Sequence, residues 1–214
     1  MENNLTDYRK SYDKYVLEET KLPINPLELF EKWFDEVDKA SGTEETNAMT
    51  VSCIGLDGFP KSRVVLLKKF SEAGFIFYTN YNSEKGKAII KNPNVCISFF
   101  WPNLERQVII KGVASKENEV ESTAYFHSRP KGSQLGAWAS DQSEIITGRK
   151  VLEKNLKSLE ETYKDKAIPK PPHWGGFIIK PISIEFWQGR PNRLHDRILY
   201  TNVSDNWQTD RLSP

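Results

Sequence analysis

A hydrophobic pattern with a period of two, interrupted by turn residues, is the feature that most constrains the fold of this chain. Apolar and polar side chains alternate in Met49–Ile54, and Asp57-Gly58 is a strong hairpin signal before the β-rich run Arg63–Phe70. We expect further strands over residues 75–79, 95–101, 107–114, 177–180, 182–188, 198–203 and 207–212. The pattern predicts a sheet of mainly antiparallel strands.

Helical segments are expected before and between these strands. Asn25 can cap a helix that has Pro26 at its first position, and the apolar residues of 26–40 fall on one helical face. Further helices are expected over 83–90, 117–127 and 132–139, and from about residue 149 onward. Antiparallel strands with inserted helices predict an α+β fold of the β-barrel type.

The length of 214 residues fits one large domain, and we expect residues 1–22 to form an N-terminal arm and residues 23–214 a single domain. The net charge of +1 favours neither nucleic acid nor a membrane surface as a partner. The polar N-terminus lacks the apolar core of a signal peptide, and no run approaches the roughly 20 apolar residues of a membrane helix. With two cysteines that lack metal-type spacing, the chain is expected to be cytoplasmic.

Three segments carry side chains suited to binding an anion. Arg63 and Lys68 lie at the ends of an apolar strand, and Lys85 lies in the first turn of a helix, where free backbone N–H groups can hold a phosphate. Tyr125, Arg129 and Ser133 follow at spacings of four, and all three are good partners for phosphate oxygens. Taken singly, each segment is more typical of a solvated surface. Together they predict binding sites for two phosphates.

A fourth segment, Glu185–Arg197, places three arginines beside Trp187 and His195 within thirteen positions. Guanidinium groups bind phosphates through paired hydrogen bonds and also stack on flat rings. The segment therefore favours a flat, anionic, conjugated small molecule. None of the three histidines has metal-ligand spacing, so no metal site is expected, and no serine-nucleophile elbow or Walker pattern is present.

Longer motifs then occur in order: R-V-V-L-L-K, F-Y-T-N-Y-N-S-E-K, L-E-R-Q-V, Y-F-H-S-R-P-K-G-S-Q-L-G-A-W-A-S-D-Q-S, W-G-G-F, E-F-W-Q-G-R-P-N-R-L-H-D-R and D-R-L-S-P. By these motifs the chain resembles the pyridoxine/pyridoxamine 5′-phosphate oxidase family from its Y-R-K-S-Y arm to its C-terminus. The resemblance implies a split β-barrel with peripheral helices, forming a homodimer that binds FMN at the subunit interface. It also implies oxidation of pyridoxine and pyridoxamine 5′-phosphates to pyridoxal 5′-phosphate, with O2 as acceptor, H2O2 as product and NH3 released from the amine.

Site residues are carried over by motif match. The resemblance implies that FMN is bound by Arg63, Val64, Val65, Leu66, Leu67, Lys68, Tyr78, Thr79, Lys85, Gln107, Gln142, Ser143, Trp187 and Arg197. It implies that the substrate is bound by Arg9, Tyr12, Lys68, Tyr125, Arg129, Ser133, Arg193, Leu194 and His195. Arg193 and His195 would face the substrate ring as the catalytic residues. The arm with Arg9 and Tyr12 would fold over the ring as a lid.

The chain departs from the family pattern at Glu84, where an arginine often precedes the phosphate-binding lysine, and in its arm, which reads R-K-S-Y instead of R-R-E-Y. An acidic side chain repels a phosphate, so Glu84 is expected to point away or the site to be rearranged. Two alternatives remain open. They are another FMN-binding split-barrel oxidoreductase and a non-catalytic protein that binds flavin or pyridoxal phosphate.

Overall fold

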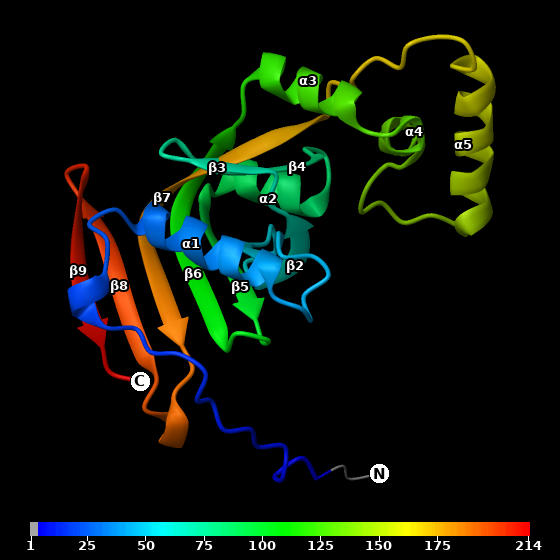
Figure 1. Ribbon diagram of the computed structural model, residues 1–214. Helices are drawn as coiled ribbons and strands as arrows, with labels where there is room; N and C mark the ends of the chain where they lie inside the picture. The colour runs from blue at the N-terminus through cyan, green and yellow to red at the C-terminus, as the bar shows by residue number, and fades with distance from the viewer. Residues whose placement is uncertain (1–3) are drawn as a thin grey trace. The chain divides into compact units, whose positions relative to one another are not determined.

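The computed structural model describes residues 4–214. Within that range five α-helices and nine β-strands follow one another (Figure 1). The helices are α1 (Pro26–Lys39), α2 (Glu84–Lys91), α3 (Glu119–Ser128), α4 (Lys131–Ala139) and α5 (Arg149–Thr162). The strands are β1 (Ala48–Ile54), β2 (Pro60–Leu66), β3 (Lys69–Ser71), β4 (Gly74–Asn80), β5 (Asn94–Trp101), β6 (Arg106–Lys116), β7 (Trp174–Gln188), β8 (Asp196–Val203) and β9 (Asn206–Leu212).

One sheet contains all of these strands. Its order is β2-β1-β5-β6-β7-β4-β3, with β8 on β7 and β9 on β8. The pairs β3–β4, β4–β7, β7–β8 and β8–β9 are antiparallel. The expected α+β class with a mainly antiparallel sheet is confirmed. The strand expected over 207–212 is also confirmed, and it pairs with β8.

Two boundaries differ from the sequence-based expectation. The expected strands 177–180 and 182–188 form one continuous strand, β7, because Pro181 lies between residues that pair with β4 and residues that pair with β8. Proline has no backbone N–H, but at this position it removes no hydrogen bond from the β4–β7 pair or from the β7–β8 pair. The expected run Arg63–Phe70 is divided into β2 and β3, and between them the Lys68 N–H donates to the carbonyl of Ile76 in β4 at 2.8 Å.

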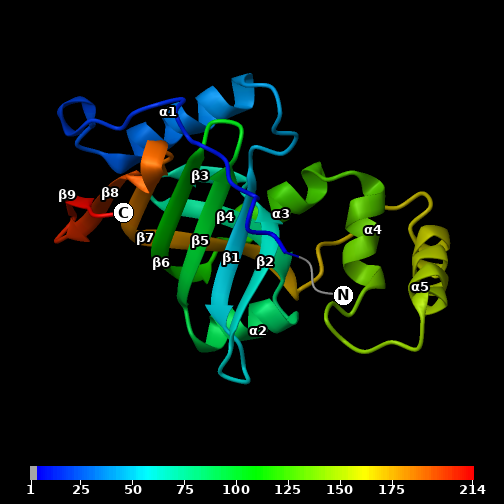
Figure 2. The ribbon, with the colours of Figure 1, turned by 90° about the horizontal axis from the view of Figure 1, so that it is seen from below.

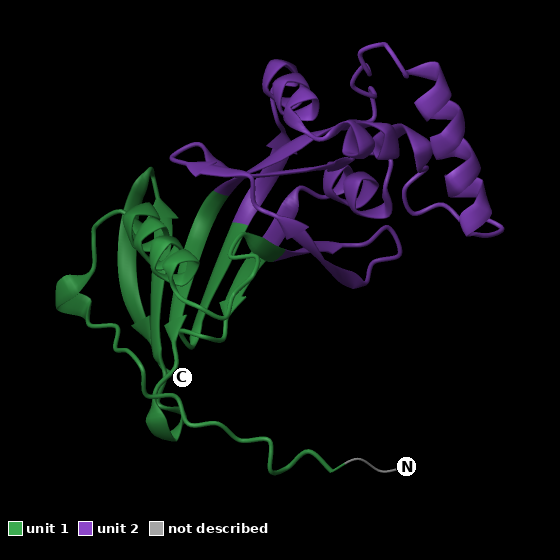
Figure 3. Ribbon diagram, turned by 45° about the vertical axis from the view of Figure 1, so that its right-hand side comes forward, with its two compact units in different colours: residues 1–49, 97–111, 181–214 green, residues 50–96, 112–180 purple. Residues whose placement is uncertain are grey.

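The first of two compact units comprises residues 1–49, 97–111 and 181–214. In it α1 lies across the strands (Figure 3). Asn25 caps α1 by accepting a hydrogen bond from the Leu27 N–H at 3.0 Å. Phe30 is fully buried with its ring centroid 5.2 Å from that of Phe99, and Trp33 meets Phe186 edge to face at 5.2 Å. The amphipathic helix expected over 26–40 is thus confirmed.

The second unit comprises residues 50–96 and 112–180 and contains α2 to α5. Helices α4 and α5 lie side by side in both views (Figures 1 and 2). Leu156 and Leu159 of α5 pack against a core of Phe126, Leu135, Ile168 and Trp174. Burial of these apolar side chains stabilises the packing of α3, α4 and α5 with the start of β7. No helix within residues 4–214 is both long and apolar enough to cross a bilayer.

Candidate functional site

A cavity of about 650 Å³ lies in the second unit. Strands β2 and β4 and helices α2, α3 and α4 supply most of its wall, and Trp174 begins β7. The sequence-predicted residues that line it are Val64, Val65, Leu66, Lys68, Tyr78, Thr79, Lys85, Tyr125, Arg129, Ser133 and Gln142. Residues predicted separately for FMN and for substrate therefore share one cavity.

The start of α2 forms a polar end of this cavity. Ser83 caps the helix by accepting from the Gly86 N–H at 3.2 Å, and its hydroxyl donates to the Asn80 carbonyl at 2.6 Å. Lys85 Nζ lies 2.9 Å from Thr79 Oγ1 and 3.4 Å from Gln142 Oε1. Burial, with a smaller contribution from nearby Arg63, lowers the pKa of Lys85. A lysine in such surroundings is stabilised by a bound anion.

An aromatic stack forms a second wall. The rings of Tyr78 and Tyr125 stack at 4.0 Å, and Tyr78 is nearly parallel to Trp174 at 5.5 Å. Burial raises the pKa of Tyr78 to about 12, so its hydroxyl stays protonated at neutral pH. Trp174 lines the cavity and is absent from the sequence-predicted site. The W-G-G-F motif was its only sequence signal.

Arg129 lies above this stack, with its guanidinium carbon 4.7 Å from the centroid of Trp174. Burial lowers the pKa of Arg129, and its Nη1 atom is buried without a hydrogen-bond partner. An unpaired buried donor on a charged group is costly unless a ligand satisfies it. The cavity therefore presents a donor suited to an anion.

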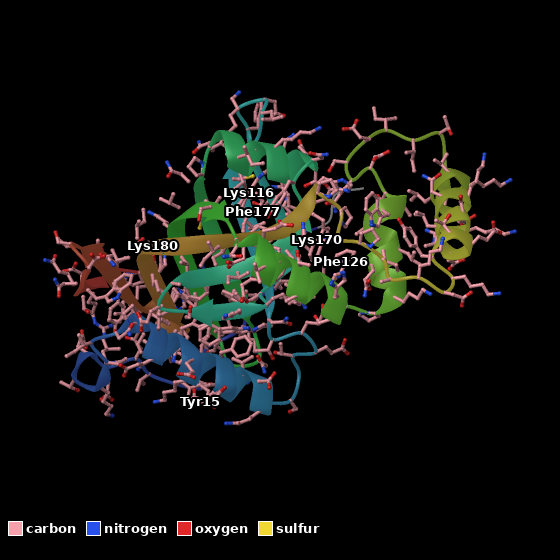
Figure 4. The ribbon with its side chains drawn as sticks, turned by 90° about the horizontal axis from the view of Figure 1, so that it is seen from above. Tyr15, Lys116, Phe126, Lys170, Phe177 and Lys180 are labelled. Atoms are coloured by element: carbon pink, nitrogen blue, oxygen red, sulfur yellow. The ribbon has the colours of Figure 1, made fainter. Side chains whose placement is uncertain are left out.

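Buried Lys170, which Figure 4 labels, joins the segments that carry the stack. Its Nζ atom donates to the Trp174 carbonyl at 2.8 Å and pairs with Glu119 of α3 at 3.0 Å. The side chain of Lys170 is only 4% exposed. This contact fixes the start of β7 relative to the helix that carries Tyr125.

Glu84 lies outside the cavity lining. Its carboxylate pairs with Lys61 and lies 3.8 Å from Arg63 Nη2, and Lys61 also pairs with Asp57 at 3.0 Å. Two cations thus offset the negative charge of Glu84. The expectation that Glu84 points away from the phosphate site agrees with this arrangement.

Of the residues predicted for FMN that belong to the second unit, three lie outside the cavity lining. Arg63 donates to Cys53 Sγ at 3.2 Å, and Leu67 is buried at 4% exposure. Ser143 accepts from the Glu84 N–H at 3.2 Å and has a left-handed φ of 77°. Arg63 and Ser143 therefore contact the residues around the start of α2 without lining the cavity itself.

A separate aromatic cluster occurs in the first unit. The rings of Trp187 and His195 lie 4.6 Å apart, and Tyr12 meets Trp187 edge to face at 5.8 Å. His195 Nδ1 accepts from the Arg190 N–H at 3.1 Å, so a neutral ring carries its proton on Nε2. Burial, followed by the nearby charge of Arg193, lowers the pKa of His195. The Nε2–H group can therefore donate to a ligand.

The remaining predicted residues also belong to the first unit. Arg197 pairs with Glu185 at 2.8 Å, and this hydrogen bond raises its pKa. Arg193 has a left-handed φ of 62°, and neighbouring Leu194 is 69% exposed. Arg9 is exposed and donates to the Thr6 carbonyl at 3.1 Å, and Gln107 lies half-buried on β6. The predicted site residues thus form two groups, one in each unit.

The part of the chain that the structure describes holds no group of three or more His, Cys, Asp or Glu side chains arranged to bind a metal ion. The donors available in the cavity are ammonium, guanidinium, hydroxyl and amide groups. Such groups suit phosphates and polar heterocycles.

Comparison with known proteins identifies strong similarities. Residues 37–163 match a family model described as pyridoxamine 5′-phosphate oxidase. Residues 174–214 match one described as the pyridoxine 5′-phosphate oxidase C-terminal dimerisation region. A Flavobacterium johnsoniae protein named pyridoxine/pyridoxamine 5′-phosphate oxidase is 64% identical over 212 residues, which cover 99% of each chain.

Two solved structures are similar in fold. PhzG from Burkholderia lata, solved with tetrahydrophenazine-1-carboxylic acid, superposes with a TM-score of 0.88 at 27% identity. That match covers 96% of this chain and 100% of the other. An FMN-binding protein from Nostoc punctiforme related to pyridoxamine 5′-phosphate oxidase has a TM-score of 0.69 at 15% identity, covering 89% and 98%. These similarities confirm the expected split-barrel fold.

Proposed function

Because the chain belongs to the pyridoxamine 5′-phosphate oxidase family, we propose that it oxidises pyridoxine 5′-phosphate and pyridoxamine 5′-phosphate with FMN as cofactor. The product is pyridoxal 5′-phosphate, with O2 as acceptor and H2O2 released. The amine substrate also releases NH3. The activity belongs to vitamin B6 metabolism.

The chemistry of the cavity fits both ligands. Lys85, Thr79 and Gln142 form a polar group that suits the FMN phosphate. Arg129, Lys68, Tyr125 and Ser133 line the same cavity and suit the substrate phosphate. Oppositely charged partners would replace the hydration that the buried cations have lost.

When bound, FMN supplies the two-electron oxidation of the substrate and passes the electrons to O2. The residues of the chain supply position and charge. Lys68 and Arg129 anchor the substrate phosphate, which fixes the reacting carbon against the flavin and lowers the barrier through orientation. Arg193 and His195 contact the substrate ring and stabilise the charge that develops on it.

We further propose a homodimer in which the first-unit group of one protomer completes the cavity of its partner. The match of residues 174–214 to a dimerisation region supports this arrangement. Trp187, Arg193, His195 and Arg197 all lie within that matched segment. The division of the predicted site residues into two groups is consistent with a shared site.

The single observation that carries the proposal is the buried, unpartnered Nη1 atom of Arg129 in a cavity that also contains Lys68 and Lys85. The test is the visible spectrum of the purified protein, followed by oxygen uptake and peroxide formation with each phosphorylated vitamer. Flavin bands and stoichiometric peroxide are expected, and unphosphorylated pyridoxine is the control. A colourless protein that FMN does not reconstitute would contradict the cofactor.

The same experiment separates the two alternatives. A flavoprotein that oxidises neither vitamer but reacts with another ring compound is a different split-barrel oxidoreductase. A protein that binds pyridoxal phosphate without forming peroxide is a carrier. The Y-F-H-S-R-P and R-L-H-D-R segments favour the oxidase, since the resemblance assigns them to substrate and not to flavin.

A further inference from the structure

Glu105 forms hydrogen bonds with two segments of the first unit that are far apart in the sequence. It lies between β5 and β6, is 1% exposed and has a left-handed φ of 57°. Its Oε2 atom accepts from the Asp13 N–H at 2.9 Å and from the Lys14 N–H at 3.2 Å. Its backbone carbonyl accepts from the Gly189 N–H at 2.8 Å. One buried residue thus holds both the N-terminal arm and the loop that follows β7.

The arm is anchored from this point toward α1. The Leu17 N–H donates to Asp196 at 3.0 Å, and Arg211 donates to the Leu17 carbonyl at 2.7 Å. The guanidinium carbon of Arg106 lies 4.7 Å from the ring centroid of Tyr15. Among the arm residues that the structure describes, Asp13 is the first whose backbone is hydrogen-bonded to the body of the unit.

Tyr12 lies immediately before this anchor. Its ring centroid is 5.8 Å from Trp187 and 6.1 Å from His195. A Cβ atom added to Gly189 would lie 2.7 Å from the Cβ atom of Tyr12. The arm and the loop after β7 therefore approach each other closely at Tyr12, and Glu105 holds the backbone of both.

We propose that Glu105 is a positioning residue, which acts by clamping the backbone at residues 13 and 14 so that Tyr12 stays against Trp187 and His195. This inference rests on the proposed function, because it assigns Glu105 the task of placing a substrate-binding side chain. The carboxylate binds main-chain N–H groups. The clamp therefore does not depend on the side chains at positions 13 and 14.

Four variants test the clamp from its two sides. Glu105→Ala removes the acceptor, whereas Glu105→Gln keeps an amide oxygen and loses only the charge. Lys14→Pro removes one of the two N–H donors and leaves the buried carboxylate in place. Lys14→Ala is its matched control, because both substitutions lose the side-chain contact of Lys14 Nζ with the Asn103 carbonyl.

The first measurement is limited chymotrypsin digestion of the holoprotein. Cleavage after Tyr12 requires release of the anchored backbone, whereas cleavage after Tyr8, which is 85% exposed, does not. Hydrogen bonds to charged groups predict about a tenfold faster cleavage after Tyr12 in Glu105→Ala. A smaller rise is expected in Glu105→Gln and Lys14→Pro. Cleavage after Tyr8 is expected to be equal in all variants.

The second measurement is anaerobic flavin reduction at varied pyridoxine 5′-phosphate concentration. A misplaced Tyr12 is expected to raise the half-saturating concentration about tenfold in Glu105→Ala, while the rate at saturation stays within about twofold. If Glu105 served only to stabilise the fold, Glu105→Ala would lower the free energy of unfolding. It would not raise the half-saturating concentration while the rate at saturation stayed nearly unchanged. Glu105→Gln is expected to recover part of the lost affinity.

Unchanged cleavage after Tyr12 and unchanged half-saturation in folded Glu105→Ala would overturn the proposal. If Glu105→Ala does not fold, the Lys14 pair decides, and equal behaviour of Lys14→Pro and Lys14→Ala overturns it. Failure of the proposed function gives a different result. The wild-type protein then forms no peroxide, while the digestion still reports whether Glu105 holds the arm.

Discussion

The Nη1 atom of half-buried Arg129 is buried without a hydrogen-bond partner, which is unusual for a charged side chain. The guanidinium carbon of Arg129 lies 4.7 Å from the ring centroid of Trp174. A phosphate placed against Arg129 would restore the lost solvation. At the residue scale, the unpartnered Nη1 donor of Arg129 therefore favours binding of an anion.

Arg129→Ala is expected to raise the KM for pyridoxine 5′-phosphate about tenfold or more, since a hydrogen bond to a charged group contributes about 1.5–3 kcal/mol. Steady-state oxygen uptake measures the change. Arg129→Lys is the control, because it keeps the charge but loses the planar pair of donors and should have an intermediate KM. An unchanged KM in Arg129→Ala would remove Arg129 from the phosphate site.

Glu84 directly precedes Lys85, the lysine expected to bind the FMN phosphate, and its carboxylate pairs with Lys61 and Arg63. Glu84→Gln is expected to bind FMN about two- to fivefold more tightly at low salt, which is the range for partly exposed charges. The gain should shrink at high ionic strength. Fluorescence quenching of FMN measures the affinity, with Glu153→Gln on α5 as a charge-matched control. Weaker binding would instead indicate that Glu84 is needed to orient Lys61 and Arg63.

His195 is expected to act as a neutral ring, because burial and Arg193 lower its pKa. The unfolded chain therefore binds more protons at this position near and below pH ~6.5, the ordinary pKa of histidine. The contribution of neutral His195 to stability is present above that pH and is lost as the pH falls through the lowered folded-state pKa. Substrate-dependent flavin reduction should decline over the same acidic range.

The pH profile of kcat/KM between about pH 5 and 8 tests this expectation. His195→Gln cannot titrate and should lose the acidic limb of the profile. An identical acidic limb in that variant would assign the limb to another group.

At the scale of elements, α1 shows that a local signal can set a boundary. Asn25 caps the helix and Pro26 occupies its first position, as the sequence predicts. The buried face of the helix then packs on aromatic residues of β5 and β7. Capping determines where α1 begins, and packing determines which side faces the strands.

Asn25→Ala is expected to lower the free energy of unfolding by about 1 kcal/mol, the usual cost of losing a capping oxygen. Urea unfolding followed by circular dichroism measures the loss. Asn25→Asp keeps a capping oxygen and adds a charge that suits the helix N-terminus, so its stability should stay near that of the wild type. Equal losses in both variants would show that the amide nitrogen of Asn25, and not its oxygen, matters.

Strand β7 shows the opposite case. Its sequence contains Pro181, which predicts a break, yet the strand continues from Trp174 to Gln188. The change of partner from β4 to β8 falls at this proline. Such an exchange depends on where two other strands lie, and no pattern within residues 174–188 reports it.

At the scale of the whole molecule, the proposed active site requires two chains. We expect hybrid dimers to recover activity when Lys68→Ala/Arg129→Ala protomers are mixed with Arg193→Ala/His195→Ala protomers. One of the two sites in each hybrid would then combine an intact cavity with an intact first-unit group. Random pairing predicts about a quarter of the wild-type activity.

The matched control places all four substitutions in one chain and mixes it with wild-type protomers. In those hybrids one site combines a damaged cavity with an intact first-unit group. The other site combines an intact cavity with a damaged first-unit group. Neither site is complete, so the hybrids themselves should be inactive. If the first mixture stays inactive although hybrid dimers form, the shared site is excluded.

By itself, the sequence determined the local elements and the family. The caps at Asn25 and Ser83, the hairpin at Asp57-Gly58 and the motifs from R-V-V-L-L-K to D-R-L-S-P are contiguous, so they can be recognised without a structure. Candidate site residues within those motifs could therefore be named in advance, and eleven of them line the cavity. Their chemistry follows from their side chains.

The tertiary structure decided which of these groups meet. The support of Arg129 by Trp174, the pairing of Glu84 with Lys61 and the clamp of Glu105 on Asp13 and Lys14 join residues far apart in the chain. The strand exchange at Pro181 is of the same kind. Contacts of this sort depend on how the elements pack and on which donors packing leaves unpaired. Local sequence patterns carry no record of either.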